Sequence, residues 1–99
     1  MTLPLELESD NAAVVYLESL SKGSYWAVRH SLETIAEIVG GEGTDPWTFP
    51  WANLRYQHTA RVRRELVQRY APATVNKMLS ALRGTLTNAW RLGLMDADT

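Results

Sequence analysis

The 99-residue sequence contains no cysteine, and it has only one phenylalanine and four prolines. Without cysteine the chain can form neither disulfides nor a thiolate site, which fits a reducing compartment. No apolar run approaches the roughly 18 residues that a membrane-spanning helix needs. The N-terminus, MTLPLELESD, is acidic and lacks the basic opening of a secretory signal. These absences predict a cytoplasmic protein with no membrane partner.

Residue groups that support catalysis or metal binding are also missing. The two histidines, His30 and His58, have no partner at metal-ligand spacing, so neither a metal nor a cofactor is expected. No glycine-rich phosphate loop follows a strand. Glu33 and Glu37 are four residues apart, so they lie on the same side of a helix and could be interpreted as a pair of catalytic carboxylates. A solvated helix face explains them more simply. We therefore expect no catalytic residues in this chain.

Acidic residues are scarce in the second half of the chain. Residues 1–50 hold two basic and eight acidic residues, a net charge of −6, whereas residues 51–99 hold eight basic and three acidic residues, a net charge of +5. The stretch YAPATVNKMLSALRGTLTNAWRLGL, residues 70–94, has three basic residues and no acid. Two explanations are open: a basic face that binds a polyanion, or two halves that attract each other within the fold.

The length suits one domain with a modest core, and apolar residues recur at helical spacing in four segments, with no strand pattern. The first helix is expected over about residues 11–20, capped by Ser9 or Asp10, because a short side-chain oxygen accepts from free amides of the first turn. Its buried face is expected to comprise Ala13, Tyr16, Leu17 and Leu20.

The second helix is expected over about residues 25–39, with Ser24 as its cap and Gly40-Gly41 at its end. Its apolar stripe comprises Val28, Leu32, Ile35, Ala36 and Val39. The connector that follows, GGEGTDPWTFP, has too much glycine and proline for regular structure. Its aromatic residues and Trp51 either stack on nucleobases or, as we prefer, fill one end of a small helical bundle.

The third helix is expected over about residues 57–69, with Val62 and Leu66 facing inward. Arg61, Arg64 and Gln68 lie on a second face of this helix, and Arg63 lies on a third.

The fourth helix begins with Pro72 in its first turn and is stopped by Gly93. Its buried stripe is expected to comprise Val75, Met78, Leu79, Leu82, Leu86, Ala89 and Trp90. The opposite face carries Thr74, Asn76, Lys77, Ser80, Arg83, Thr87 and Arg91. Gly84 costs about 1 kcal/mol in mid-helix, which suits a position where a neighbour comes very close.

These segments resemble the N-terminal core-binding domain of tyrosine recombinases, the phage integrase family. Residues 74–83, TVNKMLSALR, match a helix-four pattern of that family, T-[IV]-N-x-x-L-x-x-L-R, and Gly93-Leu94-Met95 matches its G-L-[IM] ending. On helix two, Ser24 is followed by a spaced apolar triplet at 28, 32 and 35. The resemblance covers roughly residues 10–98.

The resemblance implies an all-α, four-helix SAM-like bundle over residues 10–94, between a tail (1–9) and the start of a linker (95–99) to a catalytic domain outside this chain. It implies a domain that clamps duplex DNA for integration and recombination, alongside other recombinase protomers. The chain itself is then a truncated, monomeric piece, and the nucleophilic tyrosine belongs to the covalently linked catalytic domain. No cofactor or metal is implied.

The expected DNA-binding residues lie on the second and fourth helices, as in the family. They are Lys22, Ser24, Arg29, Thr74, Asn76, Lys77, Ser80 and Arg83. Lysine and arginine displace counterions from phosphates, while asparagine, serine and threonine contact phosphates or base edges. The second helix is less basic here than is usual in the family, so we expect the third and fourth helices to make a larger share of the DNA contacts.

Two other function classes compete with DNA binding. A helical protein-interaction domain would use the same apolar stripes and offer its basic face to an acidic partner. A small enzyme would need a polar pocket, for which the sequence offers no residues.

Overall fold

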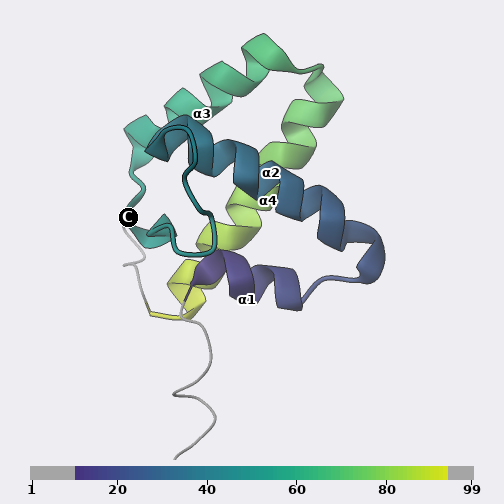
Figure 1. Cartoon of the computed structure of the whole chain (residues 1–99), viewed down its shortest axis with the longest axis vertical. Helices are drawn as coiled ribbons and strands as arrows, with labels where there is room; N and C mark the ends of the chain where they lie inside the picture. Colours follow the sequence, from purple (N-terminus) through teal and green to yellow (C-terminus); the bar gives the residue numbers. More distant parts are fainter. Residues whose placement is uncertain (1–10, 94–99) are drawn as a thin grey trace, which may run out of the picture.

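The computed structural model describes residues 11–93, which form four α-helices and one short 3₁₀-helix and contain no strand (Figure 1). The elements are α1 (Ala12–Glu18), α2 (Lys22–Gly40), η2 (Trp51–Asn53), α3 (Tyr56–Arg69) and α4 (Pro72–Arg91). The expected all-α four-helix bundle is therefore confirmed. The expected tail (1–9), the linker (95–99) and the Leu94-Met95 part of the motif lie outside the described residues, as do Ser9 and Asp10.

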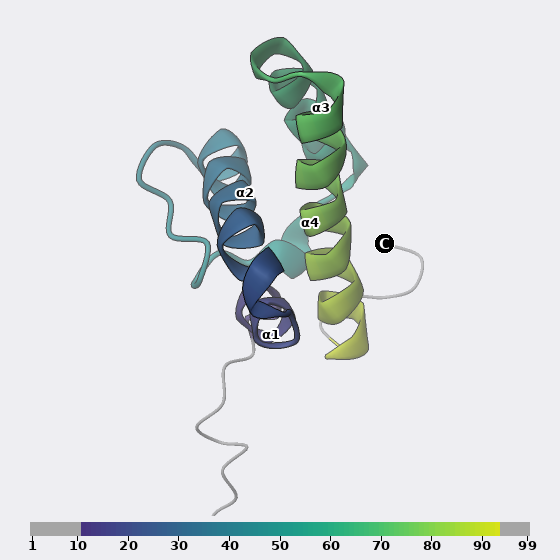
Figure 2. The same cartoon turned by 90° about the vertical axis from the view of Figure 1, so that its right-hand side faces the viewer.

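The helices pack in two layers, with α4 at the centre of the contacts. Figure 1 shows α2 crossing α4, while α3 and α4 form a V joined by a short turn. In the turned view of Figure 2, α2 lies on one side, and α3 and α4 lie on the other. α4 contacts α1, α2, α3 and η2, so it is the element through which the bundle is held together.

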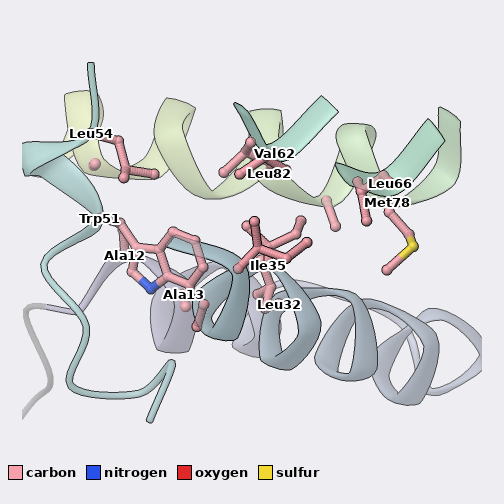
Figure 3. Close-up of a cluster of buried hydrophobic side chains, with 14 of the residues drawn as sticks. Ala12, Ala13, Leu32, Ile35, Trp51, Leu54, Val62, Leu66, Met78 and Leu82 are labelled. Carbon is pink, nitrogen blue, oxygen red and sulfur yellow. The ribbon is translucent and has the colours of Figure 1, made fainter. Parts of the chain in front are cut away.

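The core lies between α2 and the α3–α4 layer (Figure 3). Its fully buried side chains include Leu32, Ile35, Val62, Leu66 and Trp51. The indole Nε1 of Trp51 donates to the carbonyl oxygen of Pro46 at 2.9 Å, which satisfies the polar atom of a buried ring. Trp47 and Phe49 pack partly buried against the same core. The preference for aromatic residues that fill one end of the bundle is thus confirmed.

Two helix starts differ from the sequence prediction. α1 is capped by Asn11, whose side-chain oxygen accepts from the amides of Ala13 at 2.9 Å and Val14 at 3.2 Å. α2 begins at Lys22 with Ser21 as its N-cap residue, so the prediction of Ser24 as the cap is wrong. Ser24 instead lies in the first turn, because Ser21 already has the extended backbone conformation that precedes a helix.

The helix ends follow the sequence more closely. Gly41, with a φ of 97°, follows the last residue of α2, and Gly93, with a φ of 76°, follows the end of α4. Both conformations are ones that residues with a side chain rarely adopt. The predicted ends of the second and fourth helices are therefore confirmed.

The buried stripe of α4 differs from the prediction at its C-terminal end. Trp90 was expected to be buried, but it is 53% exposed. Ala81 and Thr85 are buried instead, and they continue through Ala89 at intervals of four residues. Trp90, one residue after Ala89, is turned about 100° out of that line. The hydroxyl of Thr85 donates to the carbonyl oxygen of Ala81 at 3.0 Å, which lowers the cost of burying it.

Gly84 of α4 packs directly against the Tyr16 side chain of α1. A Cβ atom at this position would lie 2.2 Å from Cζ of Tyr16 and 2.5 Å from its hydroxyl oxygen. The expected close neighbour is therefore present, and it is the ring of Tyr16.

Candidate nucleic-acid interface

A shallow groove runs between the N-terminal half of α2 and the N-terminal half of α4. It is lined by Gly23, Ser24, Ala27, Val28, Ser31, Asn76, Lys77 and Ser80, and we call it the α2–α4 groove. Four of the eight sequence-predicted DNA-binding residues thus line a single surface, although they come from segments about fifty residues apart. Among residues 11–93, no acidic residue lines this groove.

The spacing of the lining residues explains why the groove forms. On α2, Ser24, Val28 and Ser31 recur at intervals of four and three, so they share one side of the helix. On α4, Asn76 and Ser80 share a side in the same way. Most of these side chains are short, so the two helices leave an open channel between them instead of closing over it.

The α2–α4 groove combines an apolar base with polar edges. Ala27 and Val28 supply apolar surface, and the hydroxyl of Ser31 is already engaged as a donor to the carbonyl oxygen of Ala27 at 3.0 Å. Asn76, Lys77 and Ser80 are exposed on the α4 side. These residues supply an amide that both donates and accepts, a cation, and a hydroxyl group. The groove can therefore bind an anion and recognise hydrogen-bonding edges beside it.

Three further predicted residues lie outside the groove lining and are exposed: Lys22, Thr74 and Arg83. Lys22 directly precedes Gly23 of the groove. Arg83 donates from Nη2 to Oγ of Ser80 at 3.1 Å, which links its charge to the groove edge. Arg83 could instead pair with an acid of the first half of the chain. Within residues 11–93 it forms no such ion pair.

Arg29 has different surroundings from the other predicted residues. Its guanidinium lies 4.8 Å from the ring centroid of Trp47 and 5.7 Å from that of Trp26. It also donates to the hydroxyl of Tyr25 at 3.2 Å and lies 3.9 Å from a carboxylate oxygen of Glu33. These contacts tie α2 to the connector between α2 and η2. Arg29 does not line the α2–α4 groove.

In the described part of the chain, no ion pair joins the two oppositely charged halves. Within residues 11–93 the ion pairs are Arg29–Glu33 on α2 and Arg69–Glu65 on α3, each inside one helix. Glu33 is nine residues after Ser24, which places it on the opposite side of α2 from the groove. The basic residues of α4 therefore have no carboxylate partner in the described part of the chain.

Sequence reasoning did not place Ala27 and Ser31 in the site, and it assigned Val28 to the core. The available signal was the series of small residues at 23, 24, 27 and 31 on one side of the second helix. Small residues on one side of a helix are compatible with a closely packed neighbouring helix and with an open surface groove. The choice depends on the crossing of α2 and α4, which a single segment does not reveal.

Other potential sites are weaker. In the residues that the structure describes, no three His, Cys, Asp or Glu side chains are grouped so that they could hold a metal ion. His58 accepts at Nδ1 from the backbone amide of Arg55 at 2.9 Å, so it stabilises the start of α3. None of the helices in this region has the length and apolar character needed to cross a membrane.

Comparison of the chain with protein-family models, curated proteins and solved structures found no match. The resemblance to tyrosine recombinases therefore depends on the sequence motifs alone.

Proposed function

We propose that this chain is the DNA-binding, SAM-like core-binding domain of a cytoplasmic tyrosine recombinase, clamping duplex DNA for integration and recombination. The observation that carries this proposal is the α2–α4 groove, which gathers Ser24, Asn76, Lys77 and Ser80 on an acid-free surface. In this proposal strand cleavage and rejoining belong to a separate catalytic domain, linked covalently in the parent protein. The chain itself then needs no cofactor and catalyses nothing.

The chemistry of the groove supports duplex DNA as the ligand. Lys77 can neutralise a phosphate and release its counterions, which supplies affinity without sequence preference. Asn76 can form paired hydrogen bonds to the edge of an adenine in the major groove. The hydroxyl groups of Ser24 and Ser80 can donate to neighbouring phosphates. The groove thus contains both a positioning contact and a sequence-reading contact.

The competing proposal is a helical protein-interaction domain whose basic face binds an acidic partner. It uses the same exposed lysine and arginines but assigns no role to Asn76. Duplex DNA and an acidic peptide of equal charge, compared at the same ionic strength, separate the two proposals.

Two variants test the proposal through the salt dependence and sequence dependence of binding. Lys77→Ala should weaken binding to all duplexes alike and reduce the slope of log affinity against log salt by about 0.9, the value for one lost phosphate contact. Asn76→Ala should cost about 1–3 kcal/mol on the preferred site and little on others. Fluorescence anisotropy with labelled duplexes at several salt concentrations measures both effects.

Lys77→Arg is the matched control, because it keeps the charge and should keep the salt slope. Chemical-shift titration at low salt locates the contact. If duplex DNA leaves the resonances of Ser24, Asn76, Lys77 and Ser80 unchanged, or if an acidic peptide binds them more tightly than DNA does, the proposed function is wrong.

A further inference from the structure

A second basic surface lies on α3, outside the α2–α4 groove. Gln57, Arg61, Arg64 and Gln68 are all exposed, and their separations of four, three and four residues place them on one line along the helix. We call these four residues the α3 line. Within residues 11–93 none of their side chains forms a hydrogen bond or an ion pair.

The charge of α3 is not compensated at this surface. Glu65 is the only acid on the helix, and its carboxylate lies 3.6 Å from the guanidinium of Arg69. Arg63 is exposed as well. α3 therefore presents three arginines within about one turn, at 61, 63 and 64, and none of them pairs with a carboxylate of residues 11–93. Val62 and Leu66 are fully buried, so the core fixes which sides of α3 face outward.

The α3 line and the α2–α4 groove are separate surfaces. No residue of α3 lines the groove. Figure 1 shows α3 beginning on the side of the molecule away from the start of α2. In Figure 2, which looks at the end where α2 starts, α4 stands in front of α3. A duplex seated in the groove therefore approaches from a different side of α4 than the one on which α3 lies.

We propose that the α3 line is a second nucleic-acid-binding surface, which contacts the sugar–phosphate backbone of a second DNA segment while a first segment occupies the α2–α4 groove. This inference rests on the proposed function. The planar guanidinium groups of Arg61 and Arg64 match the geometry of phosphate oxygens, and Gln57 and Gln68 add amide donors at the two ends. The line spans about 16 Å at the helical rise of about 1.5 Å per residue, long enough for more than one phosphate of a strand to lie along it.

The test compares two double variants of the whole chain. Arg61→Ala/Arg64→Ala removes both charges, and Arg61→Lys/Arg64→Lys keeps them. The side chains of Arg61 and Arg64 are exposed, so neither double variant should disturb the core. Equal unfolding midpoints for the two variants and the unchanged chain would confirm that the fold is intact. The probes are two short DNA duplexes, one carrying a donor fluorophore and the other an acceptor. Energy transfer reports whether one protein molecule holds both duplexes.

The unchanged chain and the lysine variant should bring the duplexes together, and the alanine variant should not. The alanine variant should also reduce the total salt slope of DNA binding by about 1.8, for two lost phosphate contacts. Its α2–α4 groove resonances should still respond to DNA.

Three results overturn the inference, and they differ in what they mean for the proposed function. If DNA shifts groove resonances but no α3 resonances, the second surface is absent and the proposed function stands. If DNA shifts neither set, both ideas fail. If a polyglutamate peptide binds the α3 line more tightly than DNA at equal salt, the partner of α3 is an acidic protein.

Discussion

Arg29 and Lys77 carry the same charge in opposite settings. The guanidinium of Arg29 has two indole rings, a hydroxyl and a carboxylate as partners, and its side chain is 34% exposed. Lys77 is exposed at the edge of the α2–α4 groove and forms no ion pair within the described residues. The first charge is engaged inside the fold, while the second is available to an external anion.

Arg29→Ala should therefore lower stability and leave the salt slope of DNA binding unchanged. The loss should be about 1 kcal/mol, because cation–π contacts at partly exposed sites contribute about 0.5–1 kcal/mol and exposed ion pairs contribute little. Urea denaturation gives the stability, and anisotropy gives the slope. A reduced slope with unchanged stability would return Arg29 to the DNA-binding residues.

Leu82 tests the assignment of the core. Its side chain is 3% exposed at the centre of α4, so Leu82→Ala should destabilise the chain by about 2–5 kcal/mol through lost burial and the cavity left behind. Arg91→Ala, on the exposed side of the same helix, should cost less than about 0.5 kcal/mol. Guanidinium denaturation of both variants is sufficient. An unchanged midpoint for Leu82→Ala would mean that the core face of α4 is assigned incorrectly.

At the scale of elements, the crossing of α1 and α4 depends on the missing side chain at Gly84. Alanine is a better helix former than glycine by about 1 kcal/mol, but its Cβ atom would overlap the ring of Tyr16. Overpacking of this kind costs about 1–3 kcal/mol. The two terms oppose each other, and the larger one depends on whether Tyr16 is present.

We expect the effect of Gly84→Ala on stability to change sign with residue 16. In the unchanged chain it should destabilise, whereas in a Tyr16→Ala background it should stabilise by up to about 1 kcal/mol, since only the helix preference remains. A double-mutant cycle measured by thermal or chemical denaturation checks this. The same sign in both backgrounds would show that Tyr16 does not limit position 84.

The elements themselves were largely predictable from the sequence, but their starts and their meeting points were not. The periodic apolar residues of α2, α3 and α4 predicted three long helices, and glycine marked the ends of α2 and α4. The start of α2 was misplaced because Ser21 and Ser24 are equally good cap residues in isolation. Trp90 was misplaced because it lies near the edge of the apolar stripe, where contacts with other elements decide burial.

The candidate site was predictable only in part. Helical spacing correctly placed Asn76, Lys77 and Ser80 on the exposed side of α4. Their position opposite Ser24 depends on how α2 crosses α4. The contact between Arg29 and Trp47 was not predictable either, because Trp47 lies in a connector eighteen residues later in the chain. Contacts of this kind depend on tertiary packing, which local patterns do not encode.

At the scale of the whole molecule, the uneven charge distribution is not offset by ion pairs between the two halves within residues 11–93. Both ion pairs of residues 11–93 are partly exposed and lie within single helices, where such pairs contribute little. The explanation that the halves attract each other therefore finds no direct ion pair between them in this region.

Unfolding of the chain should accordingly respond weakly to salt. Raising sodium chloride from about 0.05 to about 0.5 M should change the unfolding free energy by less than about 1 kcal/mol, because the ion pairs of residues 11–93 are local and partly exposed. Urea denaturation, in which the denaturant itself is uncharged, is the suitable measurement. A loss of several kcal/mol would show that the two halves do attract each other across the fold.

The unequal burial of the tryptophans gives the molecule its own optical reporters. Trp51 is 1% exposed, whereas Trp26 is 71% and Trp90 is 53% exposed. An indole in an apolar interior emits at shorter wavelengths than one in water, so the blue part of the emission spectrum comes from Trp51 and, to a smaller extent, from the half-buried Trp47. A water-soluble quencher will extinguish Trp26 and Trp90 first. The residual blue emission then reports whether Trp51 is still packed in the core.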